Sequence, residues 1–286
     1  MLTNPGSDRV RSVRKLSGRS AREREGRFVA EGPQAVREAV AAGAVRELYA
    51  TPDAASRHHE IVAAAADRGV ACRPVTAEVL AAMADTVTPQ GLLAVCASVH
   101  VPLADVLAAG PLLVAVLARV RDPGNAGAVI RAADAAGAEA VILTDASVDV
   151  HNPKCVRSTA GSLFHLPIVT GVPLPEALAR LREAGLAVYA ADGAGEMDLD
   201  DLADAASGGA AAGLAGPTAW VFGNEAWGLP EADRALADGV VRVPVHGSAE
   251  SLNLATAATV CLYASARAQR RSSGCRVPAP ARTSPP

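Results

Sequence analysis

The sequence predicts an α/β protein with a smaller N-terminal domain and a larger C-terminal one. Runs rich in Val, Leu and Ala alternate with amphipathic stretches along most of the 286 residues, which is the pattern of strands alternating with helices. Half of the residues are apolar but only 3% are aromatic, so small aliphatic side chains must build the core. A connecting stretch at 101–110 separates two such regions. We therefore expect domains over 1–105 and 106–270, followed by a disordered basic tail over 271–286.

Charged residues are unevenly distributed along the chain. Residues 1–28 contain eight basic and three acidic residues, and residues 267–286 contain five arginines and no acid, although the whole chain has a net charge of −3. Basic ends on an acidic body favour a polyanionic partner such as nucleic acid, although merely solvated ends would have the same composition. We expect a basic, partly helical N-terminal arm, whose candidate nucleic-acid-binding side chains are Arg9, Arg11, Arg14, Lys15 and Arg27.

The first domain is expected to contain three strands and three helices. Apolar periodicity and glycine punctuation place helices at 31–42, 58–68 and 78–84, and strands at 45–50, 70–75 and 92–99. The second domain should contain a largely parallel sheet, because its apolar runs are short and nearly continuous. Its expected strands are 112–117, 140–143, 166–169, 187–191, 219–222 and 240–243; its expected helices are 126–136, 153–162, 174–184, 199–202, 231–237 and one from 252 that is buried on most sides.

One segment that could contain catalytic or binding residues is LARVRDPGNAGAVIRAADAAG, residues 117–137. It reads as a strand, a polar loop and a helix whose free N–H groups favour anions, with Asn125 as a possible cap and Arg131 reaching back over the same end. An ordinary βαβ turn is one alternative. Dinucleotide binding is another, supported by Asp145 at the next strand end. It is disfavoured because Gly124-x-x-Gly127 is not GxGxxG and Asp122 would repel a pyrophosphate.

Two further segments also end strands in polar loops. In VFGNEAWGLP (221–230), Gly223 permits close approach of a ligand and Glu225 follows the strand's carboxyl end, where α/β proteins bind ligands. A surface turn with a solvated Glu is the alternative. Trp227 is unusually large for such a loop and could pack on a ligand or cover the core. In VPVHGSAESLNLATAATVCLYA (243–264), a polar loop precedes the apolar helix, with Ser248 or Ser251 as its cap.

A fourth segment, HNPKCVRSTAGSLFHLP (151–167), contains Lys154 and Arg157, which could meet phosphate or form a solvated helix face.

The sequence lacks the motifs typical of metal-binding, membrane and secreted proteins. Five scattered cysteines without a CxxC pair and six histidines without ligand spacing predict no metal site and a reduced, cytoplasmic setting. No apolar run approaches the roughly 20 residues that span a membrane, and no signal peptide is recognisable.

The segments 117–137, 221–230 and 243–264 resemble, in this order, the three signatures of the SpoU family of RNA ribose methyltransferases within the SPOUT superfamily. The stretch GRFVAEGPQAVREAVAAGAVRELYAT (26–51) is similar to the ribosomal-protein-like RNA-binding domain found in many members. The resemblance implies a C-terminal SPOUT domain with a deep trefoil knot. It also implies a homodimer with the active site at the interface.

The resemblance further implies methyl transfer from S-adenosylmethionine to a ribose 2′-OH of RNA, without a metal. The implied catalytic residues are Asn125, Arg131, Glu225, Ser251 and Asn253, and the implied cofactor-binding residues are Gly223, Val243, Leu252 and Ala191. Because a guanidinium stays protonated, our hypothesis is that Arg131 binds phosphate and stabilises the developing alkoxide, while Glu225, Ser251 and Asn253 orient it and the ribose.

The separate N-terminal domain resembles that of the family members that act on ribosomal RNA, so 23S ribosomal RNA is the expected substrate rather than tRNA. The Ala- and Arg-rich composition is associated with genomes in which such enzymes confer antibiotic resistance. Two alternatives stay open: a tRNA methyltransferase and a non-catalytic RNA-binding protein of the same fold.

Overall fold

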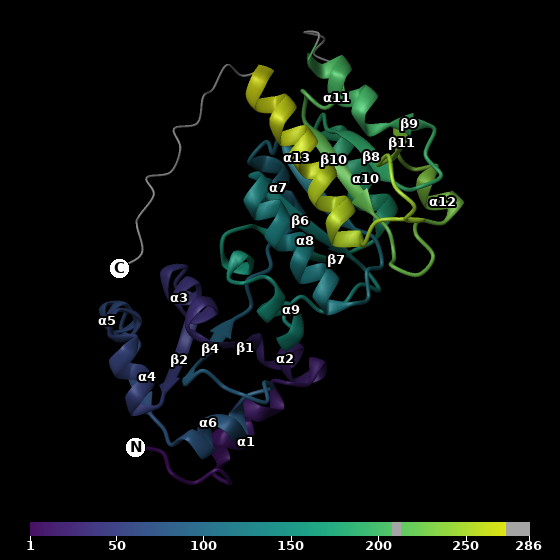
Figure 1. Cartoon of the computed structure of the whole chain (residues 1–286). Helices are drawn as coiled ribbons and strands as arrows, with labels where there is room; N and C mark the ends of the chain where they lie inside the picture. Colours follow the sequence, from purple (N-terminus) through teal and green to yellow (C-terminus); the bar gives the residue numbers. More distant parts are fainter. Residues whose placement is uncertain (208–212, 273–286) are drawn as a thin grey trace.

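The computed structural model describes residues 1–207 and 213–272, which form two lobes in chain order (Figure 1). The N-terminal lobe contains a four-stranded sheet of order β1-β4-β2-β3, in which β4 runs antiparallel to both of its neighbours. Its strands are β1 (Arg27–Glu31), β2 (Val45–Ala50), β3 (Cys72–Pro74) and β4 (Leu92–Ala97). Its later helices are α3 (Pro33–Ala41), α4 (Pro52–Arg57), α5 (His59–Asp67) and α6 (Ala77–Met83).

The basic N-terminal segment is part of this lobe and is not a free arm. It forms α1 (Asp8–Lys15) and α2 (Arg19–Glu25). The apolar side chains Val10, Val13 and Leu16 are buried in one cluster with residues of α6. Arg22 is also buried and forms an ion pair with Asp149 of the other lobe at 2.7 Å. The apolar residues interleaved with the basic ones are what attach this segment to the domain.

The C-terminal lobe is built on a seven-stranded sheet of order β7-β6-β5-β10-β8-β11-β9, in which all recorded pairs are parallel. Its strands are β5 (Leu113–Leu117), β6 (Ala140–Thr144), β7 (Ile168–Val172), β8 (Ala187–Ala191), β9 (Met197–Asp198), β10 (Thr218–Phe222) and β11 (Gly239–Arg242). The central strands β5 and β10 are buried along their whole length, as expected for strands covered on both faces.

Helices cover both faces of this sheet (Figure 1). They are α7 (Leu103–Ala108), α8 (Pro123–Ala136), α9 (Pro153–Ser158), α10 (Leu174–Glu183), α11 (Leu199–Ser207), α12 (Glu231–Arg234) and α13 (Leu254–Ser272), with a 3-10 turn η1 (Ser162–Phe164). Helix α13 packs along α8 and the sheet, where Ser265 accepts a 2.8 Å hydrogen bond from the buried Trp220 indole. None of the described helices has the length and apolarity needed to cross a membrane.

Several expectations from the sequence need correction. Strand β1 replaces the start of the helix expected at 31–42, since Gly32 adopts a φ of +86° and the helix begins only at Pro33. The helix expected at 58–68 is α5, and an additional short helix that was not expected, α4, precedes it and meets it at His58. Helix α13 is buried on one side only, because Val260 and Tyr263 remain 39% and 45% exposed.

Two of the expected domain boundaries fall within helices. The boundary at 105 lies inside α7, and α13 continues through Ser272. The remainder of the predicted tail, 273–286, lies outside the described residues.

Candidate active site

The Glu225 carboxylate joins the first two predicted segments. It accepts hydrogen bonds from the backbone N–H groups of Arg121 and Asp122, at 3.4 and 3.2 Å, and from the side-chain amide of Asn125 at 3.3 Å. The third segment is attached through Asn253, whose amide donates to Asn125 Oδ1 at 3.1 Å. These contacts connect residues that lie at least 100 positions apart in the sequence. We call Glu225, Asn125 and Asn253 the three-residue network.

The sheet topology explains why these segments meet. The first segment follows β5, the second follows β10 and the third follows β11. These strands are parallel and lie within one stretch of the sheet, so their carboxyl ends share an edge. The crevice beyond this edge is where open α/β sheets bind ligands.

The helix caps next to the network differ from the predicted ones. Asp122, not Asn125, caps α8, and its Oδ1 accepts from the Asn125 backbone N–H at 2.8 Å. Asn253, not Ser248 or Ser251, bonds the first turn of α13, accepting from the Ala255 N–H at 2.9 Å. The Asn125 side chain is therefore available to the network. Since Asn253 uses its oxygen for the helix and its NH₂ for Asn125, its orientation is fixed by both contacts.

Lys154 contacts this same helix terminus. Its ammonium group lies 2.9 Å from Asp122 Oδ2, so it is already paired within the protein and is not free to bind phosphate. The Lys154 hydrogen bond, together with the Asn125 backbone N–H, holds the pKa of Asp122 below its usual range. Asp122 is thus a structural carboxylate that positions the start of α8.

The loop after β10 is closely folded. Asn224 and Gly228 exchange two backbone hydrogen bonds of 3.0 and 2.9 Å, and the Asn224 amide donates to the Arg119 carbonyl at 3.0 Å. A Cβ atom on Gly223 would lie only 2.5 Å from the Gly228 carbonyl carbon. Glycine is therefore required at 223 by the fold of the loop itself, which displays Glu225 and Trp227 between its two ends.

A cavity of about 720 Å³ lies beside the network at the carboxyl ends of β8, β10 and β11. All four predicted cofactor-binding residues line it, together with Glu225 and Ser251; the four are Ala191, Gly223, Val243 and Leu252. Its volume is in the range of cavities that enclose a small organic ligand. Phe222, Leu254 and Ala257 add apolar surface to its wall.

Asp192, which was not selected from the sequence, also lines this cavity. It accepts from the Leu229 N–H at 3.4 Å and lies 3.4 Å from the Arg234 guanidinium. It therefore connects the β8 end to the loop after β10. The available signal was its position, an acid directly after a buried strand and before Gly193.

Arg131 does not join this arrangement within one chain. It is exposed on α8 and does not line the cavity. Over the described ranges no hydrogen bond or ion pair links it to Glu225, Ser251 or Asn253, so the expected orientation of Arg131 by these residues is not made within a single chain. Ser251 lines the cavity without joining the network.

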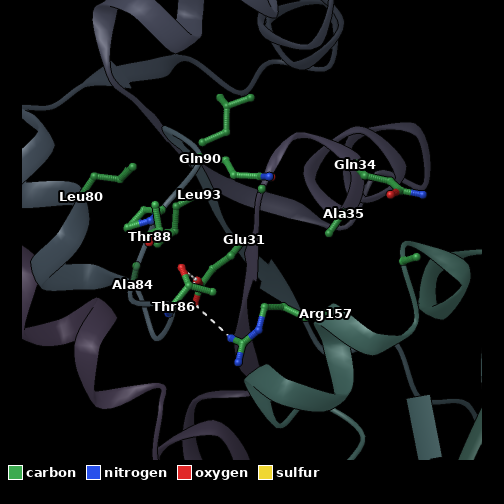
Figure 2. Close-up of a pocket in the computed structure, with 14 residues that line it drawn as sticks. Glu31, Gln34, Ala35, Leu80, Ala84, Thr86, Thr88, Gln90, Leu93 and Arg157 are labelled. Atoms are coloured by element: carbon green, nitrogen blue, oxygen red, sulfur yellow. Dashed lines mark hydrogen bonds and ion pairs between the residues drawn. The ribbon is translucent and has the colours of Figure 1, made fainter. Parts of the chain in front are cut away.

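A second cavity, of about 300 Å³, lies between the lobes and contains Arg157 (Figure 2). The Arg157 guanidinium lies 3.0 Å from Asp85 and 3.9 Å from Glu31, both in the N-terminal lobe. Glu31 in turn accepts from the backbone N–H groups of Asp85 and Thr86 at 2.8 and 3.2 Å. Arg157 therefore connects the lobes, and it remains about one-third exposed at the edge of the cavity.

The N-terminal cations fall into two groups. Arg9 and Arg27 both pair with Glu47, and Arg11 pairs with Asp8. In the part of the chain that the structure describes, Arg14 and Lys15 have no ion-pair partner and are exposed. These two are the predicted RNA-binding residues that most freely present positive charge to solvent.

Two further predictions concern metal and dinucleotide sites. Within 1–207 and 213–272, no group of three His, Cys, Asp or Glu side chains could hold a metal ion. Gly127 of the Gly-x-x-Gly turn is required by helix packing, because its Cβ would lie 2.5 Å from the Ser158 Cβ and 2.6 Å from the Cys155 carbonyl. That glycine spacing therefore has an explanation that does not involve a phosphate.

Comparison with known proteins agrees with this geometry. The model of the SpoU rRNA Methylase family matches residues 112–263, and that of the MRM3-like substrate binding domain matches residues 7–94. The 23S rRNA (guanosine(2553)-2′-O)-methyltransferase RlmP of Bacillus subtilis is 31% identical over 258 residues, which covers 90% of this chain and 95% of that protein.

Two solved structures are similar over nearly the whole chain. One is the AdoMet-bound rRNA methyltransferase from Sinorhizobium meliloti, with a TM-score of 0.80 and 29% identity over 93% of this chain and 97% of that one. The other is the SpoU methyltransferase AviRb from Streptomyces viridochromogenes in complex with AdoMet, with a TM-score of 0.78 and 32% identity over 93% and 100%. With its signature segments joined in one site and its family match over 112–263, this chain belongs to the SpoU rRNA Methylase family.

Proposed function

We propose that this protein transfers a methyl group from S-adenosylmethionine to a ribose 2′-OH of 23S ribosomal RNA. The observation that carries the proposal is the single cavity lined by all four predicted cofactor-binding residues, with Glu225 linking it to Asn125 and Asn253. Family membership and the match of residues 7–94 to a substrate-binding domain support the reaction and favour ribosomal RNA over tRNA. The cytoplasm, where ribosomes form, is the expected place of action.

The residues that line the cavity fit S-adenosylmethionine. Its apolar wall suits an adenine ring, and the carboxylates of Asp192, Glu225 and Glu250 suit the positive charges of the sulfonium and amino groups. When bound, the cofactor supplies an electrophilic methyl group, so the protein has to align the hydroxyl with it and assist loss of the hydroxyl proton. In this proposal the amides of Asn125 and Asn253 and the Glu225 carboxylate bind and orient the ribose.

We also infer that the enzyme acts as a homodimer. Arg131 is exposed on α8 outside the cavity of its own chain, and Val260 and Tyr263 form an exposed apolar face on the adjacent α13. A second copy packed on this face would bury apolar surface and could bring Arg131 to the cavity of its partner. There the guanidinium would bind the phosphate next to the target ribose and stabilise the developing alkoxide.

The reaction is tested with radiolabelled S-adenosylmethionine and unmodified 23S rRNA and tRNA in parallel. Labelled RNA is then digested with alkali, which cannot cleave after a 2′-O-methylated ribose because the attacking hydroxyl is blocked. We expect label in 23S rRNA, within alkali-resistant dinucleotides. Label in alkali-labile mononucleotides would contradict ribose methylation, and label in tRNA alone would contradict the substrate.

The cofactor site is tested by one glycine that lines the cavity and one that lies far from it. Gly223→Ala should weaken S-adenosylmethionine binding at least about tenfold, because its Cβ would displace the Gly228 backbone that closes the loop. Gly18→Ala is the matched control, since Gly18 lies in the N-terminal lobe with a φ of −87° and a Cβ there would meet only the Lys15 carbonyl oxygen at 3.5 Å. Titration calorimetry measures both affinities. Equal affinities for the two variants would place the cofactor elsewhere.

The shared site is tested by mixing two inactive chains, Arg131→Ala and Glu225→Ala. If Arg131 serves the partner's cavity, each mixed dimer has one intact site, and random exchange at equal concentrations should restore about a quarter of wild-type activity. Each variant alone should lose about 100-fold or more in kcat. If the mixtures stay as inactive as the separate variants, Arg131 acts in its own chain and the active site is not shared between two subunits.

A further inference from the structure

The two tryptophans of this chain have opposite environments. Trp220 is fully buried and donates its indole N–H to Ser265, whereas Trp227 is 52% exposed and lines the 720 Å³ cavity. No hydrogen bond is recorded for the Trp227 indole among the described residues. A core-covering role, one of the two expected from the sequence, therefore does not account for Trp227.

The loop fixes Trp227 beside the network. Its two ends are tied by the Asn224–Gly228 hydrogen bonds, and Glu225, two residues earlier, contacts Asn125. Gly228 adopts a φ of +64°, which sets the direction of the chain directly after Trp227. The ring is thus held on the same short loop that carries the carboxylate of the network.

Arg121 adds a second planar group. Its guanidinium carbon lies 5.3 Å from the Trp227 ring centroid, within the range of a cation–π contact. Its backbone N–H is bonded to Glu225, so the position of Arg121 depends on the same carboxylate. In the described ranges Arg121 has no carboxylate partner, and its positive charge is free to attract phosphate.

We propose that Trp227, backed by Arg121, is the platform on which the base of the target nucleotide stacks. This proposal rests on the proposed function, because it places the base next to the ribose that the network orients. Proteins hold unpaired RNA bases on aromatic rings and on arginine guanidinium planes, and a base held in this way has to leave its helix. A ring that stacks without reading base edges tolerates any base, so the platform sets the position of the nucleotide rather than its identity.

The proposal predicts how turnover depends on the ring. Trp227→Ala should lower kcat/KM for 23S rRNA about 5- to 150-fold, the loss expected for one base–aromatic stack, and Trp227→Phe should lose less. Affinity for S-adenosylmethionine, measured separately, should fall much less than kcat/KM in both variants, although the ring also lines the cavity. Leu112→Ala is the matched control, since Leu112 is 50% exposed but precedes β5, at the opposite end of the sheet from the cavity. Equal kcat/KM for Trp227→Ala and the control would overturn the proposal.

Tryptophan fluorescence gives a test that does not require turnover. Because Trp220 is buried, added 23S rRNA should quench mainly Trp227, and Trp227→Phe should remove the quenching. Quenching by S-adenosylhomocysteine alone, with no further change on adding RNA, would assign the ring to the cofactor and overturn the proposal. If the wild type bound RNA and quenched without methylating it, the proposed function would fail while the platform would stand.

Discussion

The site depends on one interaction at the solvent-exposed carboxyl edge of the sheet, the bridge that Glu225 makes between segments that are about 100 residues apart. Its carboxylate accepts hydrogen bonds from two backbone N–H groups just before α8 and from the side-chain amide of Asn125. Asn125 Oδ1 in turn accepts a hydrogen bond from the Asn253 amide. A carboxylate can accept several hydrogen bonds at once, so Glu225 connects loops that have no regular structure of their own. Trp227, Arg121 and the cavity wall are all positioned through those loops.

The parallel sheet makes this bridge possible, because it brings the carboxyl ends of β5, β10 and β11 to one edge. Glycines then set how closely the chain can pack there. Gly223 lies against the Gly228 backbone, and Gly127 lies against α9, so both would clash if they carried a side chain. These two glycines thus serve the site, as the small aliphatic residues serve the core.

Much of the fold and of the cavity was predictable from the sequence, since strands such as 113–117 and 187–191 are continuous apolar runs and all four cofactor-binding candidates line one cavity. Strand β1 was missed because its pairing with β4 is set by tertiary contacts. The α8 cap was misassigned although Asp122 before Pro123 is a strong capping signal. The partners of Arg22, Lys154 and Arg157 lie far away in the sequence and leave no local pattern. The trefoil knot and the homodimer stay predictions.

The most direct measurement is a double-mutant cycle on methyl transfer to 23S rRNA, using Glu225→Ala, Asn253→Ala and the double variant. If the three-residue network acts as one unit, each single variant should lose about 100-fold in kcat, and the double variant should lose little more than the worse single one. Losses that multiply would show that Glu225 and Asn253 act independently. A Glu225→Ala enzyme with near wild-type turnover would contradict the central role given to its carboxylate.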